Sequence, residues 1–216
     1  MQFRFLFLVF LLSTIFVSAR FNKNGDFQIW ETHTLEKTIT DSFGIRIDNE
    51  LRIGDDISRV FYLYVQGFLV YRPYNWLILS PGYRQEWLRK DGALKPQYVP
   101  QFDTYFIYVS DKIVITNRNR LGYLFRYKEF NSIFYRGRLR FSFPLRKESL
   151  FMQPYIDNEI FIIQGRGFNQ NRSSIGVLFK VTDHFDPRFY YMVRLDKENG
   201  SWKQINIIGL HLYFTY

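Results

Sequence analysis

The chain has 216 residues, no cysteine, a net charge of +9, and an aromatic fraction of 20%. The lack of cysteine excludes a disulfide framework and a thiolate metal site. The aromatic fraction exceeds what a soluble core requires, and the positive charge suggests anionic surroundings such as lipid phosphates, without by itself indicating nucleic acid.

The first residues predict export. Arg4 supplies a positive charge, residues 5–17 are mostly apolar, and the small residues Ser18 and Ala19 suit cleavage. A membrane anchor helix is the alternative, but about 20 apolar residues are needed to span a bilayer. We therefore expect residues 1–19 to be a signal peptide, and residues 20–216 to form one barrel domain.

Eleven strand-like segments follow, and no later stretch is long and apolar enough for a spanning helix. They cover residues 26–34, 42–53, 59–71, 75–88, 98–109, 112–127, 132–143, 150–163, 169–182, 187–197 and 202–216. Most are longer than ordinary globular strands and suit tilted strands that cross hydrocarbon with about 9–11 residues. The longest connection is expected at residues 90–100. Tight turns elsewhere predict an antiparallel meander that closes into a barrel.

Charged and apolar residues alternate along these segments. Arg136, Arg138 and Arg140 share one parity, whereas Leu139 and Phe141 share the other, which is the period of a β-strand. An arginine facing lipid near the bilayer midplane would cost about 2–4 kcal/mol. We therefore predict an all-β transmembrane barrel with a charged lumen and an apolar, aromatic exterior. A soluble periplasmic lipid-binding barrel would have the opposite arrangement, and the broad aromatic face favours the membrane protein.

The last segment supports a location in the bacterial outer membrane. Ile208, Leu210, Leu212 and Phe214 alternate with other residues up to the final Tyr216. This end resembles the C-terminal insertion signal of bacterial outer-membrane barrels, although it ends with Tyr where Phe is commonest. The predicted partners are therefore the outer-membrane insertion machinery and membrane lipid, either phospholipid or lipopolysaccharide. A last strand of a soluble sheet is the alternative.

The order of several segments resembles a family of bacterial proteins. The segments are GYRQEW (82–87), RNRLGYLFRY (118–127), RGRLRFSFPL (136–145), NEIFI (158–162) and FNQNRSSIGVLFK (168–180). In this order and spacing they resemble the proteins grouped as domain of unknown function 2490, over essentially the whole mature chain. The resemblance implies an outer-membrane β-barrel of a Gram-negative bacterium. It implies no activity and no catalytic residue.

The count of eleven conflicts with a general rule. Single-chain bacterial barrels have even strand numbers, with both termini in the periplasm. Phe27, Ile29 and Trp30 break strict alternation in the first segment. We therefore expect that segment to be a plug or partial strand, which leaves ten strands, unless a missed strand gives twelve.

The inward faces should bring charged residues of neighbouring strands together. The predicted lumen cluster comprises Arg118, Arg120, Arg126, Arg136, Arg138, Arg140, Asp157 and Glu159. Arginine binds phosphate and carboxylate bidentately, so the cluster predicts an anion-selective pore or a binding site for an anion or lipid phosphate. The structural interpretation, which we favour, is a ladder of ion pairs that fills a narrow lumen.

A lipid-modifying hydrolase or acyltransferase is the alternative function. His184 lies between Asp183 and Asp186, Ser173 and Ser174 precede it, and His211 would face the lumen beside Tyr213; these are the candidates for acid–base chemistry. No nucleophile motif accompanies them. Three isolated histidines also lack metal-ligand spacing. We therefore favour a protein that is not an enzyme, and we expect no catalytic residue, metal or cofactor.

Overall fold

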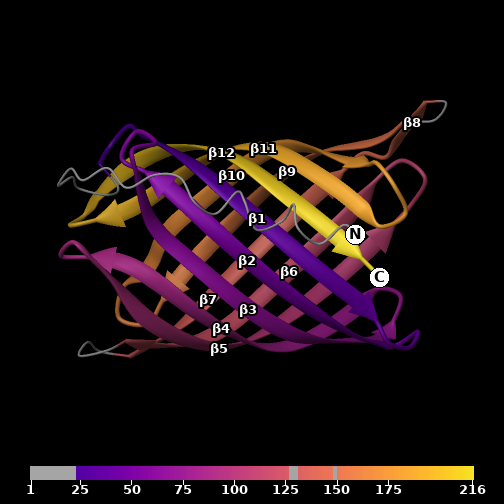
Figure 1. Cartoon of the computed structure of the whole chain (residues 1–216), viewed down its shortest axis with the longest axis horizontal. Coiled ribbons are helices and arrows are strands. Elements are labelled where there is room, and N and C mark those ends of the chain that lie inside the picture. Colours follow the sequence, from indigo (N-terminus) through magenta and orange to yellow (C-terminus); the bar gives the residue numbers. More distant parts are fainter. Residues whose placement is uncertain (1–22, 127–130, 148–149) are drawn as a thin grey trace, which may run out of the picture.

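In the computed structural model, residues 23–126, 131–147 and 150–216 are described, and they form a closed β-barrel (Figure 1). Among these residues no helix is long and apolar enough to cross a membrane. The predicted signal peptide, residues 1–19, lies outside the described residues. The predicted all-β class with one barrel is confirmed.

The strands follow one another around the wall almost in chain order. They are β1 (Asp26–Thr38), β2 (Phe43–Gly54), β3 (Arg59–Tyr74), β4 (Leu77–Lys90), β5 (Ala93–Val109), β6 (Val114–Arg126), β7 (Ser132–Ser142), β8 (Leu145–Lys147), β9 (Leu150–Ile163), β10 (Gly167–Lys180), β11 (Phe185–Glu198) and β12 (Ser201–Thr215). The short β8 continues β7 along the same partner, β9. The barrel therefore has eleven strands around its circumference.

The first and last strands close the barrel in parallel. Asp26 to Glu36 of β1 pair with Ile205 to Thr215 of β12, and Figure 1 shows the two arrows pointing to the same side. All other neighbouring strands are antiparallel. The expectation of an even strand number was therefore wrong, as was that of an entirely antiparallel sheet. An odd number of strands joined by hairpins forces the closing pair to be parallel.

The first segment is a complete strand, which corrects the prediction of a plug. Its side chains alternate without a break, with Gln28 and Trp30 turned inward and Phe27 turned outward. Trp30 occupies an inward position because the Arg52 guanidinium lies 3.6 Å from its ring centroid. A cation above an aromatic face is an attractive contact, so an apolar ring is suited to a charged lumen.

The long connection predicted at residues 90–100 was also wrong. Asp91 and Gly92 form a tight turn with φ of 51° and 80°, and β4 and β5 pair immediately beyond it. Two left-handed residues are typical of a two-residue hairpin turn. Pro96 and Pro100 lie within β5, where they pair with β4, while the β5 ladder to β6 is interrupted between residues 98 and 101. The strand tolerates Pro100 because its ladder to β6 is incomplete there.

The outer wall is mostly apolar and aromatic, as predicted, and aromatic side chains lie near both of its ends. Trp76 stacks with Phe106 at one end, with ring centroids 6.3 Å apart. At the other end, the ring centroids of Phe168 and Trp202 lie 5.4 Å apart. Aromatic girdles of this kind mark the two interfaces of membrane barrels.

The lumen is closed at the end where β1 begins. There the buried residues are Asp26, Gln28, Trp30, Phe61, Ile205 and Ile207, which we call the sealed end. A β-bulge opposite Arg52 turns both Phe61 and Tyr62 inward although they are sequence neighbours. The turn after β2 also covers this end, because the Asp56 amide donates to the Asp26 carboxylate at 2.9 Å.

Inside the barrel, the ring of Tyr190 lies directly over Gly209 on the neighbouring strand. A Cβ at residue 209 would lie only 1.8 Å from the ring's Cζ atom. We expect Gly209→Val to displace the ring and to lower the free energy of unfolding by about 1–3 kcal/mol. Urea unfolding in lipid vesicles measures this effect. Gly67→Ala is the control, because a Cβ added at residue 67 would have nothing within 4 Å, and an equal loss there would contradict the prediction.

Candidate functional site

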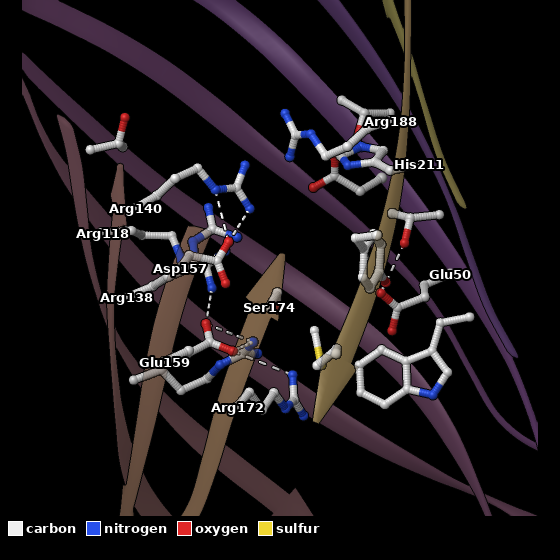
Figure 2. Close-up of a pocket in the computed structure, with 18 of the residues that line it drawn as sticks. Glu50, Arg118, Arg138, Arg140, Asp157, Glu159, Arg172, Ser174, Arg188 and His211 are labelled. Carbon is white, nitrogen blue, oxygen red and sulfur yellow. Dashed lines mark hydrogen bonds and ion pairs between the residues drawn. The ribbon is translucent and has the colours of Figure 1, made fainter. Parts of the chain in front are cut away.

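A cavity of about 450 Å³ occupies the lumen. It extends from Trp30 near the sealed end to Ile107, Thr116 and Tyr213, which lie near the opposite end of the barrel. Nine arginines and four carboxylates line it. Figure 2 shows Arg138, Arg140 and Asp157 on one side of the cavity, and Arg188 with His211 on the other. The cavity is therefore a strongly cationic chamber.

Glu159 of β9 is the centre of the largest ion-pair cluster. Its carboxylate pairs with Arg118 of β6, with Arg136 of β7 at 3.0 Å and with Arg172 of β10 at 3.4 Å. Four strands are thereby joined through one buried side chain. Three cations around one carboxylate leave a local excess of positive charge.

Two further carboxylates each hold an arginine. Asp157 accepts hydrogen bonds from Arg140 Nε at 2.8 Å and Nη2 at 2.5 Å. Asp103 receives two from Arg120, at 2.6 and 2.7 Å, and its side chain is fully buried. The Arg120 pair is bidentate, the geometry that makes arginine–carboxylate pairs strong.

Two cavity arginines have no carboxylate partner. Among the described residues, neither Arg138 of β7 nor Arg188 of β11 has a carboxylate oxygen within 4.0 Å, and the buried Nε atom of each has no hydrogen-bond partner. Both line the cavity. Arg188 also lies near the Tyr155 ring, at 5.5 Å from its centroid, and Arg140 lies over the same ring at 4.1 Å. Cationic groups thus remain available at this part of the cavity.

The structure places the eight predicted cluster residues in two locations. Seven of them line the cavity: Arg118, Arg120, Arg136, Arg138, Arg140, Asp157 and Glu159. Arg126 lies at the end of β6, where its guanidinium donates to the Ser132 hydroxyl at 3.3 Å. It is not among the residues that line the cavity.

The predicted lumen cluster did not include the cavity arginines of β2, β10 and β11, nor the rings beneath them. The guanidinium carbon of Arg46 lies 4.4 Å from the ring centroid of Phe68, and that of Arg172 lies 4.3 Å from the ring centroid of Phe161. The alternation of each strand could have predicted these inward rings. Phe161, for example, lies two residues from the inward Glu159 on the same strand. The prediction of an aromatic exterior does not cover these rings, because stacking under guanidinium groups places several of them inside.

The opposite wall of the cavity positions His211. The Thr34 hydroxyl donates to Asp48 at 2.7 Å and lies 2.8 Å from His211 Nε2. A hydroxyl has one proton, so Nε2 is the donor to Thr34. No serine or cysteine nucleophile contacts this imidazole among the described residues.

The residues proposed for hydrolysis are not brought together. His184 Nδ1 lies 2.9 Å from the Thr215 carbonyl oxygen, and its ring stacks on Tyr216. Ser173 is on the outer wall and accepts from Asn158 at 2.9 Å. In the described part of the chain no group of histidine, cysteine and acidic residues has the arrangement of a metal site.

Comparisons with known proteins agree with this architecture. No curated protein matches the sequence. Among solved structures, the β domain of the Bordetella autotransporter BrkA is similar, with a TM-score of 0.50 and 11% identity over 76% of this chain and 78% of that one. At this identity the likeness shows a shared fold, that of an outer-membrane-type β-barrel. Residues 27–205 match one family along most of their strands, which confirms the resemblance found in the sequence, and the chain belongs to the family described as "Protein of unknown function (DUF2490)".

Proposed function

We propose that this protein binds an anionic ligand, carrying a phosphate or carboxylate group, inside its lumen. The observation that carries the proposal is the pair Arg138 and Arg188, which face the cavity without a carboxylate partner. Burying an unpaired cation is costly, so a ligand that neutralises both groups would be stabilised strongly. Arg140 and His211 supply further polar groups on the two sides of the cavity.

The cavity favours binding over continuous transport. Its lining ends at Trp30, and the residues of the sealed end beyond Trp30 are almost fully buried. A ligand would enter from the opposite end, near Tyr213, and leave by the same route. The arginine fork suits tetrahedral phosphate and planar carboxylate alike, so the anionic group is the recognised chemistry.

We place the protein in the bacterial outer membrane. The barrel fold, the aromatic residues near both ends of the wall and the alternating final strand up to Tyr216 support this location. The same proposal includes export by the signal peptide and insertion by the outer-membrane machinery. It also includes contact with phospholipid or lipopolysaccharide.

Isothermal titration of the purified barrel in detergent tests the proposal. The probes are inorganic phosphate and a short-chain phosphatidic acid, which separate a free anion from a lipid headgroup. We expect Arg138→Gln with Arg188→Gln to weaken binding by about tenfold to a hundredfold for each charge, since a hydrogen bond to a charged group contributes about 1.5–3 kcal/mol. The fold should survive, because neither arginine is part of an ion pair.

Arg166→Gln is the matched control, since it removes the same charge from an exposed turn between β9 and β10. Its affinity should equal that of the wild type. Equal weakening by Arg166→Gln would indicate general charge attraction. Absence of binding to both probes, or unchanged affinity in the double variant, would refute the lumen site.

A further inference from the structure

The outer wall has a group of polar side chains in the middle of three strands, β6, β9 and β10. It comprises Asn117 and Asn119 of β6, Asn158 of β9, and Asn171 and Ser173 of β10, which we call the amide strip. These residues alternate with inward ones such as Arg118, Glu159 and Arg172, so their side chains face outward. They lie at a depth where a membrane barrel normally presents only apolar residues.

The strip consists of two hydrogen-bonded groups on neighbouring strands. Asn119 pairs in register with Gly137 of β7, and Asn158 pairs with Ser173 of β10. The Tyr135 hydroxyl donates to Asn119 Oδ1 at 2.6 Å and so bridges β7 to β6. Asn158 Nδ2 donates to Asn171 Oδ1 at 3.1 Å. Two hydrogen-bonded polar groups, one on β6 and β7 and one on β9 and β10, thus lie side by side, with Leu139 of β7 between Asn117 and Asn158 in the register.

These internal bonds leave hydrogen-bonding capacity directed outward. Asn117 accepts from Asn119 at 2.6 Å, and no hydrogen bond from its own amide nitrogen is found within the described chain. A side-chain amide offers two N–H donors and two acceptor lone pairs. Hydrocarbon supplies neither donors nor acceptors, and unsatisfied polar groups are expensive there. The strip therefore requires a polar partner within the membrane.

We propose that the partner is a second copy of this chain, bound through the same strip about a two-fold axis. An amide surface is self-complementary, because each side chain both donates and accepts, and this is what a two-fold interface requires. The strip has no formal charge, so a charged partner would find no counter-ion on it. Lipid headgroups lie toward the barrel ends, where the aromatic residues gather. Exposed Leu139 lies within the strip, and exposed Leu121 and Ile175 flank it; all three supply apolar contact area.

The absence of cysteine from the chain allows a direct test. The full-length protein is expressed in its membrane as Ser173→Cys or as Val65→Cys, and then oxidised. Val65 lies mid-strand on the outer face of β3, across the barrel from the strip. We expect most of the Ser173→Cys protein to migrate as a disulfide-linked dimer and Val65→Cys to stay at the background level. Equal cross-linking of both variants, or none of either, would overturn the proposal.

A second measurement uses replacement by leucine, which membrane barrels tolerate on the lipid face. We expect Asn158→Leu with Asn171→Leu to weaken self-association at least tenfold, measured by energy transfer between labelled copies in lipid vesicles. Asn49→Leu is the control, because Asn49 is another outward mid-strand amide, bonded to His33 at 3.0 Å on the far wall. Unchanged association in the double variant, or an equal loss with Asn49→Leu, would also refute the interface.

Discussion

Glu159→Gln is expected to lower the free energy of unfolding by about 3–5 kcal/mol, because removing one member of a buried ion pair leaves its partners uncompensated. Here three arginines share the carboxylate, and none of their side chains is more than 11% exposed. Arg118, Arg136 and Arg172 would repel one another after the change. Urea unfolding of the barrel in lipid vesicles measures the loss.

Two comparisons make this prediction specific. Adding Arg136→Gln to Glu159→Gln should recover part of the loss, since it removes one of the stranded cations. Glu31→Gln is the matched control, because Glu31 is half-buried on the outer wall and pairs with His33. If Glu159→Gln lowers the free energy of unfolding by less than about 1 kcal/mol, its ion pairs contribute no more than exposed ones do. That result would contradict a central role for Glu159 in the lumen.

Trp30→Ala is expected to have the second large effect. It should lower the free energy of unfolding by about 3–5 kcal/mol, because removing the ring leaves a cavity. The ring is only 2% exposed and packs against Ile205 and Ile207 beneath the Arg52 guanidinium. Its removal also extends the lumen cavity toward the sealed end. We therefore expect the wild-type barrel to be silent in planar bilayers and the variant to conduct ions.

Trp202→Ala separates the two effects, because Trp202 lies on the outer face near the end of the barrel and is exposed. This variant should remain silent and nearly as stable as the wild type. Conductance of the wild type equal to that of Trp30→Ala would mean that Trp30 does not close the lumen. In that event the barrel would be a pore.

The parts of the structure that depend on local alternation were predictable from the sequence. Arg136, Arg138 and Arg140 share a parity, and the cost of placing them in lipid determines which face turns inward. The turn residues located most strand ends. Asp157 and Glu159 follow from the same rule, since they occupy alternate positions in β9.

The remaining features depend on how strands meet, which local patterns do not contain. The parallel closure of β1 on β12 results from the strand number and the register around the whole wall. The bulge that turns Phe61 inward requires two residues to face one on the neighbouring strand. Trp30 breaks the apolar alternation of its segment, which led to the prediction of a plug, while its true neighbour is Arg52, which lies on another strand.

The parallel junction of β1 and β12 also determines how the barrel assembles and comes apart. It joins residues that are farthest apart in the chain, so it has the highest entropy cost of loop closure and should form last. Its luminal side is secured by two side-chain contacts, Thr34 to His211 at 2.8 Å and Tyr213 to Glu36 at 2.5 Å. Unfolding should therefore begin as a lateral opening between these strands. Because His211 and Tyr213 also line the cavity, a ligand held there would slow that opening.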